Sequence, residues 1–333
     1  MTERVDVLIA GAGIAGTSLA FELADIASVL LLERESQPGY HSTGRSAAML
    51  TETYGSASVR ALAGASRSFL AAPPEGFCET PLLCPRGMLH IARADQHAAL
   101  EAAYRAAAAL VPSVRRLRAA EIVEQVPAID PAYAGGGLLE PDAMAIDVAA
   151  LHQGYLRGFR RRGGGLVSDA EIVAIESQHD GWRVETRAGS FAGGVLVNAA
   201  GAWADQLARI AGVAPVGLVA KRRTALLLDP PDGIDPVSWP MVIDVEEQFY
   251  FKPEAGQLLL SPGDETPVAP CDVQPEELDV AIAIERYREV TGRPVRRIGR
   301  RWAGLRSFVA DPDPVGGDAP NAPGFFWLAG QGG

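Results

Sequence analysis

The sequence predicts an α/β fold in which two domains are interleaved along the chain. With 333 residues, the chain is long for a single simple core. Residues 6–10 and 29–33 are apolar runs that flank a glycine turn and a helical segment, as in a βαβ unit of a parallel sheet. Residues 221–261 instead contain short strand-like segments separated by turns, which are typical of an antiparallel sheet.

The other elements follow from periodicity and from residues that begin or end helices. Asp147 is expected to cap a helix that continues to the glycines at 163–165. Further helices are predicted over residues 17–24, 95–110 and 276–291. Strands are predicted over residues 165–168, 171–176, 182–186, 195–199, 224–228, 241–244, 248–252, 257–260 and 325–329. Residues 311–324, rich in Pro, Asp and Gly, are expected to form a loop.

Composition excludes several classes of function. The net charge of −11 argues against nucleic acid as the main partner, because phosphate binding requires a basic face. Three cysteines and five scattered histidines form no metal-ligand pattern, so we expect free thiols and no metal site. No apolar run reaches the ~18 residues of a spanning helix, and no secretory signal precedes residues 7–10. We therefore expect a soluble, cytoplasmic protein, a monomer or a dimer.

The glycine turn predicts a dinucleotide site. A GxGxxG motif stands between the first strand and the first helix. Its first glycine permits the tight turn, the second lets the backbone approach a pyrophosphate, and the third allows close helix packing. Glu33 ends the second strand, where a carboxylate accepts hydrogen bonds from a ribose, and Arg34 follows it. The alternative is a plain tight turn without a ligand. The motif residues are Gly11, Ala12, Gly13, Ile14, Ala15 and Gly16.

Four later segments carry a resemblance to a known family. They are residues 41–48 (HSTGRSAA), 197–203 (VNAAGAW), 302–308 (WAGLRSF) and 330–333 (GQGG). Together with the glycine turn, they resemble the D-amino acid oxidase superfamily over essentially the whole chain, and especially bacterial D-arginine dehydrogenases. The resemblance implies FAD, bound by a Rossmann-like domain of the glutathione-reductase type, beside an α+β substrate domain on a mixed or antiparallel sheet. We expect the FAD domain in residues 1–50, 140–205 and 300–333, and the substrate domain in 51–139 and 206–299.

The resemblance also implies further cofactor contacts. The loop after Ser42 would supply backbone N–H groups and the Arg45 side chain to the pyrophosphate and the flavin edge, and its alanines would leave room for the ring. Ile172 matches a position that meets the adenine, although an ordinary buried strand residue is the alternative. The last glycines would lie against the flavin pyrimidine, and a complete protein is expected to continue with a helix there. These residues are Thr43, Gly44, Arg45, Ser46, Ala47, Ala48, Ile172, Ala199, Ala200, Gly201, Trp203, Gly304, Gly332 and Gly333.

The substrate site is predicted around Arg306, because a guanidinium binds a carboxylate with two parallel hydrogen bonds. The resemblance places Arg306 there, with Arg223 as a helper and with Tyr54 and Tyr250 near the substrate. The alternatives are a surface salt bridge for Arg306, a solvated basic run for Arg223 and a core aromatic for Tyr250. No residue is distinguished as a general base, so the substrate amine is expected to lose its proton to solvent before hydride transfer.

Two positions depart from the D-arginine dehydrogenase pattern. Met49 stands where those enzymes carry a histidine, and Met88 (or Gly87, if the alignment slips) stands where they carry a glutamate that faces the basic side chain. Loss of the charged partner should lower kcat/KM for basic substrates by tens- to thousands-fold, that is by about 2–5 kcal/mol. We therefore expect apolar or neutral D-amino acids to be preferred over D-Arg and D-Lys.

Several alternatives share these features. A glycine or sarcosine oxidase, or a 2-hydroxy acid dehydrogenase, would use the same cofactor motifs and the same arginine. A non-catalytic flavoprotein would retain the motifs without the reaction, and a simple NAD(P)-dependent dehydrogenase would leave the later motifs unexplained. The electron acceptor is expected to be a quinone or a carrier, with oxygen as the alternative.

Overall fold

The first sheet is parallel at its centre, as predicted. The computed structural model describes residues 3–332 of the chain. In the first sheet, parallel strands run in the order β9–β2–β1–β12–β19, and β10, β11 and β18 add antiparallel pairs at its margins. The strands are β1 (Glu3–Ala10), β2 (Val29–Leu32), β9 (Gly165–Val167), β10 (Ile172–Gln178), β11 (Gly181–Thr186), β12 (Gly189–Asn198), β18 (Val315–Asp318) and β19 (Phe325–Ala329).

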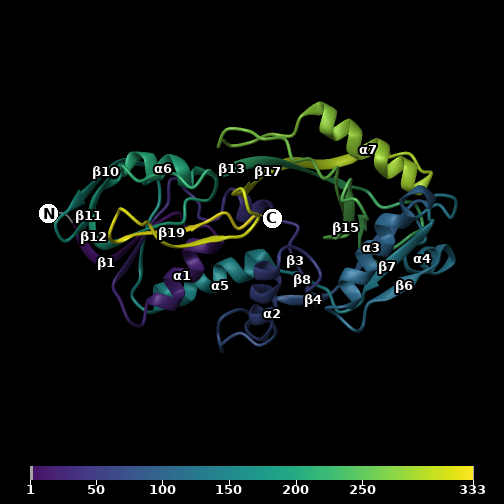
Figure 1. Cartoon of the computed structure of the whole chain (residues 1–333), viewed down its shortest axis with the longest axis horizontal. Coiled ribbons are helices and arrows are strands. Elements are labelled where there is room, and N and C mark those ends of the chain that lie inside the picture. Colours follow the sequence, from purple (N-terminus) through teal and green to yellow (C-terminus); the bar gives the residue numbers. More distant parts are fainter. Residues whose placement is uncertain (1–2, 333) are drawn as a thin grey trace.

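Helices cover both faces of this sheet, which explains the apolar runs of its central strands at residues 7–10, 29–32 and 195–197. Helices α1 (Ile14–Leu23) and α5 (Val148–Arg161) lie on one face, and α6 (Ala204–Ile210) lies on the other (Figure 1). The side chain of Asp147 caps α5 as predicted, because its Oδ1 accepts a hydrogen bond of 2.8 Å from the Ala150 N–H.

The second sheet is mixed, also as predicted. Its order is β17–β13–β16–β15–β14–β5–β7–β6, and only β14 and β5 pair in parallel. Figure 1 shows β13 and β17 extending from the first half of the molecule into the second. The strands are β5 (Met88–Ala92), β6 (Arg115–Leu117), β7 (Gly136–Glu140), β13 (Val219–Leu228), β14 (Met241–Asp244), β15 (Tyr250–Glu254), β16 (Gln257–Ser261) and β17 (Ile298–Phe308).

The two faces of this second sheet have different roles. On the outer face, Phe251, Leu258 and their neighbours form a core with helix α7 (Glu277–Thr291), whose Tyr287 ring meets Phe251 edge to face at 5.8 Å. Helices α3 (His97–Ala108) and α4 (Ala119–Gln125) pack near the β5–β7 end. Because side chains alternate along a strand, Arg223 and Tyr250 lie on the opposite face, which covers the cavity described below.

Smaller elements connect the two halves. A three-stranded antiparallel sheet joins β3 (Met49–Leu50), β8 (Met144–Ile146) and β4 (Leu83–Pro85), next to helix α2 (Ala57–Ala71). Short 3₁₀ turns occur at Ser42–Arg45, Ala94–Gln96 and Gly201–Trp203.

Two of the strands lie where none was predicted. Strand β17 pairs along its length with β13 and so belongs to the second sheet. Strand β18 interrupts the loop expected at 311–324, because residues 315–318 find backbone partners on β19. The division into two domains stays a prediction.

The described part of the chain contains no helix with the length and apolarity that crossing a membrane requires. Within residues 3–332, Cys78, Cys84 and Cys271 are free thiols, and His, Cys, Asp and Glu side chains form no metal-binding group.

Candidate active site

The glycine turn after β1 is closely packed. Gly11 has a φ of 104°, and a Cβ there would lie 2.4 Å from the carbonyl oxygen of Ala199. A Cβ on Gly16 would lie 1.9 Å from the carbonyl oxygen of Gly11, so α1 packs directly against the turn. The Ala12 N–H donates a hydrogen bond of 2.8 Å to the buried carboxylate of Glu33. The turn therefore has the geometry that the motif predicts, with Glu33 fixed beside it.

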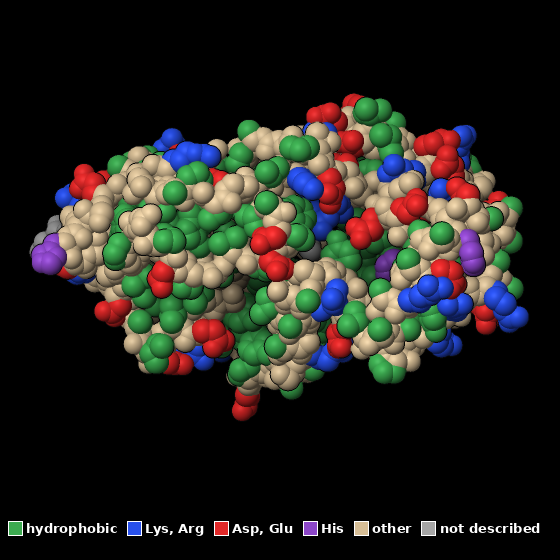
Figure 2. Space-filling view, viewed as in Figure 1, with side chains coloured by type: hydrophobic (Ala, Val, Ile, Leu, Met, Phe, Trp, Pro, Cys, Tyr) green, Lys and Arg blue, Asp and Glu red, His purple; other side chains and the backbone are tan. Residues whose placement is uncertain are grey.

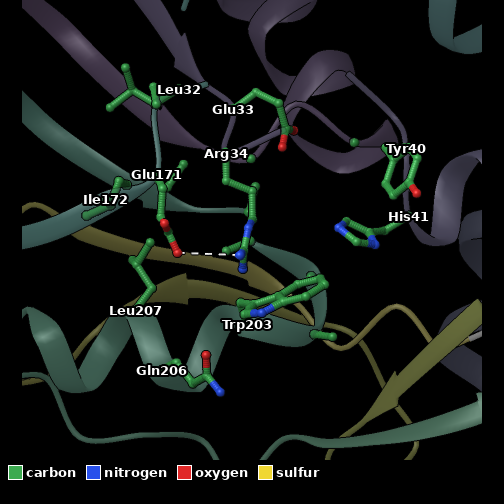
Figure 3. Close-up of a pocket in the computed structure, with 18 of the residues that line it drawn as sticks. Leu32, Glu33, Arg34, Tyr40, His41, Glu171, Ile172, Trp203, Gln206 and Leu207 are labelled. Atoms are coloured by element: carbon green, nitrogen blue, oxygen red, sulfur yellow. Dashed lines mark hydrogen bonds and ion pairs between the residues drawn. The ribbon is translucent and has the colours of Figure 1, made fainter. Parts of the chain in front are cut away.

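A first cavity, of about 210 Å³, lies next to this turn. Figure 3 shows the Arg34 guanidinium extending toward Trp203, over whose ring it lies at 4.9 Å, with Glu171 bonded to it at 3.4 Å. The predicted lining residues are Gly11, Gly13, Glu33, Arg34, Thr43, Ile172, Ala199, Ala200, Gly201 and Trp203. The kind of side chain changes along this cavity. A carboxylate lies near the glycine turn, and aromatic and apolar side chains lie beyond it.

The loop after β2 is anchored on both sides of the cavity. The Thr43 hydroxyl accepts a hydrogen bond of 3.0 Å from the Ile14 N–H at the start of α1, and the Ser42 hydroxyl donates one of 2.6 Å to the Leu305 carbonyl. Arg45 lines the second cavity, and its guanidinium pairs with Asp272 at 2.5 Å and donates to the Ala303 carbonyl at 2.9 Å. That arginine therefore joins the loop to β17 and to the segment around Asp272, and its contact with the cofactor stays a prediction.

A second cavity, of about 470 Å³, lies between the two sheets. Figure 2 shows a hollow near the middle of this face, with Lys, Arg, Asp and Glu side chains at its upper edge. The two cavities meet, because both are lined by Gly13, Ser42, Thr43, Ala199 and Gly201. Besides these shared residues, the predicted residues that line the second cavity are Ile14, Ala15, Arg45, Ser46, Ala47, Ala48, Met49, Tyr54, Met88, Arg223, Tyr250, Gly304, Arg306 and Gly332.

Two arginines mark one part of this second cavity. Arg306 Nη2 donates to the Tyr54 hydroxyl at 3.3 Å, and its Nη1 lies 3.4 Å from Glu265 Oε1. Arg223 has shorter bonds, 2.8 Å to the Asp264 carbonyl and 3.0 Å to the same Glu265 oxygen. Both side chains are about 15% exposed. The guanidinium of Arg306 is therefore held by longer bonds than that of Arg223, although both contact Glu265.

Apolar side chains form another part of the wall of the second cavity. Met88 and Met241 are neighbours across β5 and β14, and they cluster with Ile243, Met49 and Tyr250. Sequence reasoning found the methionines at 49 and 88 but missed Met241 and Ile243. The alternation of β14 could have revealed them, since they share the face of Tyr250.

Some predicted residues do not line either cavity. Ala12, Gly16 and Gly44 are absent from both walls, and they act instead through a backbone bond, helix packing and a turn. Gly333 lies outside the described residues. Lining residues that sequence reasoning missed include Tyr40, Glu171, Gln206, Thr51 and Glu247. Glu247 and Glu171 lie on connecting segments that contain no recognisable sequence motif.

The geometry fits an extended dinucleotide. Gly13 lines both cavities without a side chain, so the backbone at the N-terminus of α1 is open to a ligand that passes from one cavity to the other. The buried Glu33 carboxylate lies at the first cavity, where a ribose would be bound. The second cavity provides apolar walls and two guanidinium groups for the ring and its reaction partner.

Comparison with known proteins gives the same result. Residues 6–333 match the model of the FAD dependent oxidoreductase (DAO) family. Glycine oxidase of Geobacillus kaustophilus is 24% identical over 347 residues, covering 99% of this chain and 89% of that protein. Its crystal structure matches with a TM-score of 0.87 over 99% of this chain and 90% of that one. L-α-glycerophosphate oxidase of Mycoplasma pneumoniae, with FAD bound, is 19% identical over 99% of this chain and 90% of that one, with a TM-score of 0.88.

A shorter match qualifies the finer expectations. L-2-hydroxyglutarate dehydrogenase of Escherichia coli K12 is 27% identical over 223 residues, which cover 63% of this chain and 50% of that enzyme. The chain thus spans about half the length of this relative. The resemblance to D-arginine dehydrogenases in particular is corrected, because the relatives found are named for glycine, sarcosine and 2-hydroxyglutarate. The broader expectation is confirmed: the chain belongs to the FAD dependent oxidoreductase family, and its cofactor is FAD.

Proposed function

We propose that this protein oxidises the carbon–nitrogen bond of a small α-amino acid, of the glycine or sarcosine type. The observation that carries the proposal is the loosely bonded guanidinium of Arg306, 3.3 Å from the Tyr54 hydroxyl, in a cavity continuous with the glycine turn. The relation to glycine oxidase, which covers 99% of this chain, supports the choice of an amino acid. This replaces the earlier expectation of a D-amino acid as the main substrate.

Arg306 would bind the substrate carboxylate. Its two bonds of 3.3 and 3.4 Å are at the long end for charged groups, so a carboxylate can take both N–H directions with shorter, parallel hydrogen bonds. Fixing the carboxylate at one end of the cavity orients the α-carbon at the other, and positioning of this kind contributes much of enzymatic rate. Bound FAD supplies the hydride acceptor.

The substrate must reach the cavity with a neutral amine. As the α-hydrogen leaves with its electron pair, the nitrogen lone pair forms the carbon–nitrogen double bond; water then adds to give a 2-oxo acid and the amine. Among the described residues that line the second cavity there is no histidine or lysine, and Glu247 is the sole carboxylate. We therefore propose that the ammonium group loses its proton to solvent. The pH dependence of flavin reduction with α-deuterated substrate tests this step.

The apolar wall of the second cavity determines which substrate side chains we expect the protein to accept. Met49, Met88, Met241 and Ile243 offer no charge to a distal basic group, so small, neutral or apolar side chains should be accepted before D-Arg and D-Lys. Glu247 is the counter-argument, since it brings one carboxylate to the cavity at the turn between β14 and β15. Including D-Arg in the substrate panel shows whether the apolar wall or the Glu247 carboxylate determines the preference.

A second candidate is oxidation of a 2-hydroxy acid, which the 27% identity with L-2-hydroxyglutarate dehydrogenase favours. Arg306 would serve such a substrate equally well. The chemistry differs at one step, because a hydroxyl group must give up its proton to a base as hydride leaves. Glu247 would then become the base to test, by its change to Gln.

The deciding experiment is anaerobic bleaching of the FAD-loaded protein with a panel of substrates. Glycine, sarcosine, D- and L-alanine, D-methionine, D-arginine and L-2-hydroxyglutarate are each mixed with the protein, and the oxidised flavin band is followed. The proposal predicts fastest bleaching by glycine or sarcosine. Bleaching by L-2-hydroxyglutarate alone would favour the second candidate, and bleaching by none would favour a non-catalytic flavoprotein. Mixing the reduced protein with oxygen or a quinone then identifies the acceptor class, which we expect to be a quinone or a carrier.

A further inference from the structure

Glu265 lies in the loop after β16 and binds three cations at the edge of the second cavity. Its Oε2 accepts from Lys221 Nζ at 2.7 Å, and its Oε1 lies 3.0 Å from Arg223 Nη2 and 3.4 Å from Arg306 Nη1. Lys221 and Arg306 are direct neighbours across β13 and β17. One protein carboxylate therefore already lies against two of the three arginines that line the cavity, Arg223 and Arg306.

The two arginines are unequally occupied by this carboxylate. Arg223 has a second short bond, 2.8 Å from its Nε to the Asp264 carbonyl, whereas the other contact of Arg306 is the 3.3 Å bond to Tyr54. A substrate carboxylate thus has a loosely held partner in Arg306. A second substrate carboxylate, directed at Arg223, would have to displace Glu265.

Glu265 is the carboxylate that Lys221, Arg223 and Arg306 share among the described ion pairs. The neighbouring Arg222 pairs instead with Asp264, Glu276 and Asp279. Because both oxygens of Glu265 are bonded to cations, a second substrate carboxylate at Arg223 would compete with Glu265 for the same guanidinium.

We propose that Glu265 occupies the position of a second substrate carboxylate and thereby selects monocarboxylates against dicarboxylates. Partial burial raises the pKa of Glu265, but the Lys221 bond and the charges of Arg223 and Arg306 outweigh this effect and lower its pKa overall. Glu265 is therefore ionised at neutral pH and repels a second anion. This inference rests on the proposed function only in requiring that the substrate carries a carboxylate.

The test is ligand binding, which does not require turnover. Acetate and malonate are titrated into the FAD-loaded protein, and the change in the flavin spectrum gives each Kd. Glu265→Gln keeps the shape of the side chain and frees one positive charge. In this variant, we expect the ratio of the acetate Kd to the malonate Kd to be at least about tenfold higher than in the parent protein. A hydrogen bond to a charged group contributes a binding free energy of this size. Asp229→Asn is the matched control, because Asp229 pairs with Arg297 at 3.0 Å in the same half and lines neither described cavity.

A second substitution shows whether the gain depends on Arg223. In the double variant Glu265→Gln with Arg223→Gln, the improved malonate binding should disappear. An unchanged acetate-to-malonate ratio in Glu265→Gln, an equal gain for both ligands, or a loss of both would each overturn the proposal, provided that flavin content shows an intact fold. If the amino acid panel fails but the malonate ratio changes as expected, the proposed reaction is wrong and this role of Glu265 stands.

Discussion

The hydroxyl oxygen of Tyr54 lies 3.3 Å from Nη2 of Arg306, although 252 positions separate the two residues in the chain. Tyr54 precedes α2, and Arg306 lies on β17 of the second sheet. The contact therefore joins the segment before α2 to the sheet that covers the cavity. It also orients a guanidinium whose remaining bonds are long.

Replacement of Arg306 tests its role most simply. Arg306→Met should lower kcat/KM for the best substrate by roughly thirtyfold to several-thousandfold, the range for removing one partner of a desolvated charge pair. FAD content should stay unchanged, because Arg306 lines the second cavity and not the first cavity beside Glu33. Arg301→Gln is the control, since the neighbouring Arg301 pairs with Glu277 at 2.7 Å and lines neither described cavity. Equal effects of both substitutions on kcat/KM would contradict the assignment.

Tyr54→Phe removes the hydroxyl that accepts from Arg306. Because this bond is 3.3 Å long, we expect a smaller effect, an increase in KM of about three- to tenfold with a modest change in kcat. Steady-state kinetics with the best substrate of the panel measures it. A large fall in kcat at constant KM would instead assign Tyr54 to the chemical step.

The glycine turn makes a graded prediction about the cofactor. Gly13→Ala places a Cβ 3.2 Å from the Thr43 hydroxyl and in the wall of both cavities, so FAD affinity should fall while the protein still folds. Gly11→Ala combines a φ of 104° with a 2.4 Å approach to the Ala199 carbonyl and should prevent normal folding. Gly64→Ala on α2 is the control, because a Cβ there meets nothing within 4 Å and should stabilise the helix by about 0.5–1 kcal/mol. Flavin content and thermal unfolding of the three variants provide the comparison.

His90 predicts a pH dependence of stability. Burial lowers its pKa to about 4, and its Nδ1 has no hydrogen-bond partner among the described residues. Between about pH 6.5 and pH 4 the unfolded chain binds a proton that the folded protein does not, so the free energy of unfolding falls as pH falls through this window. The full shift corresponds to about 3 kcal/mol.

A variant without a titrating group at this position should lose that contribution. His90→Leu should therefore show a smaller fall in unfolding free energy between pH 7 and pH 4.5 than the parent protein, as measured by urea unfolding. His179→Gln, at an exposed turn between β10 and β11, is the control. An identical pH dependence in the parent and His90→Leu would contradict this, because it would mean that His90 binds its proton over the same pH range in the folded and unfolded states.

The cofactor side of the site was predictable because backbone constraints leave a mark in the sequence. Gly11 and Gly16 are required because a Cβ at either position would lie 2.4 or 1.9 Å from a backbone carbonyl oxygen. The apolar run of β2 likewise reflects its burial on both faces, and Glu33 follows at its end. Each of these residues acts within a local segment whose geometry is fixed by its neighbours.

Long-range pairing explains what the sequence did not reveal. The motif predicts Arg45 as a cofactor contact but does not reveal that its guanidinium pairs with Asp272, 227 positions later. Glu265 lies in a loop without a motif, and its importance depends on Lys221, Arg223 and Arg306 from two other strands. Strand β17 was missed for the same reason, since its partner β13 is remote in the chain.

The most direct test of the central claim is a crystal structure of the FAD-loaded protein with acetate bound. The account predicts the flavin ring in the second cavity, with the acetate carboxylate bonded to the Arg306 guanidinium and close to the Tyr54 hydroxyl. A structure in which the acetate binds elsewhere, or in which the ring does not face Arg306, would contradict it.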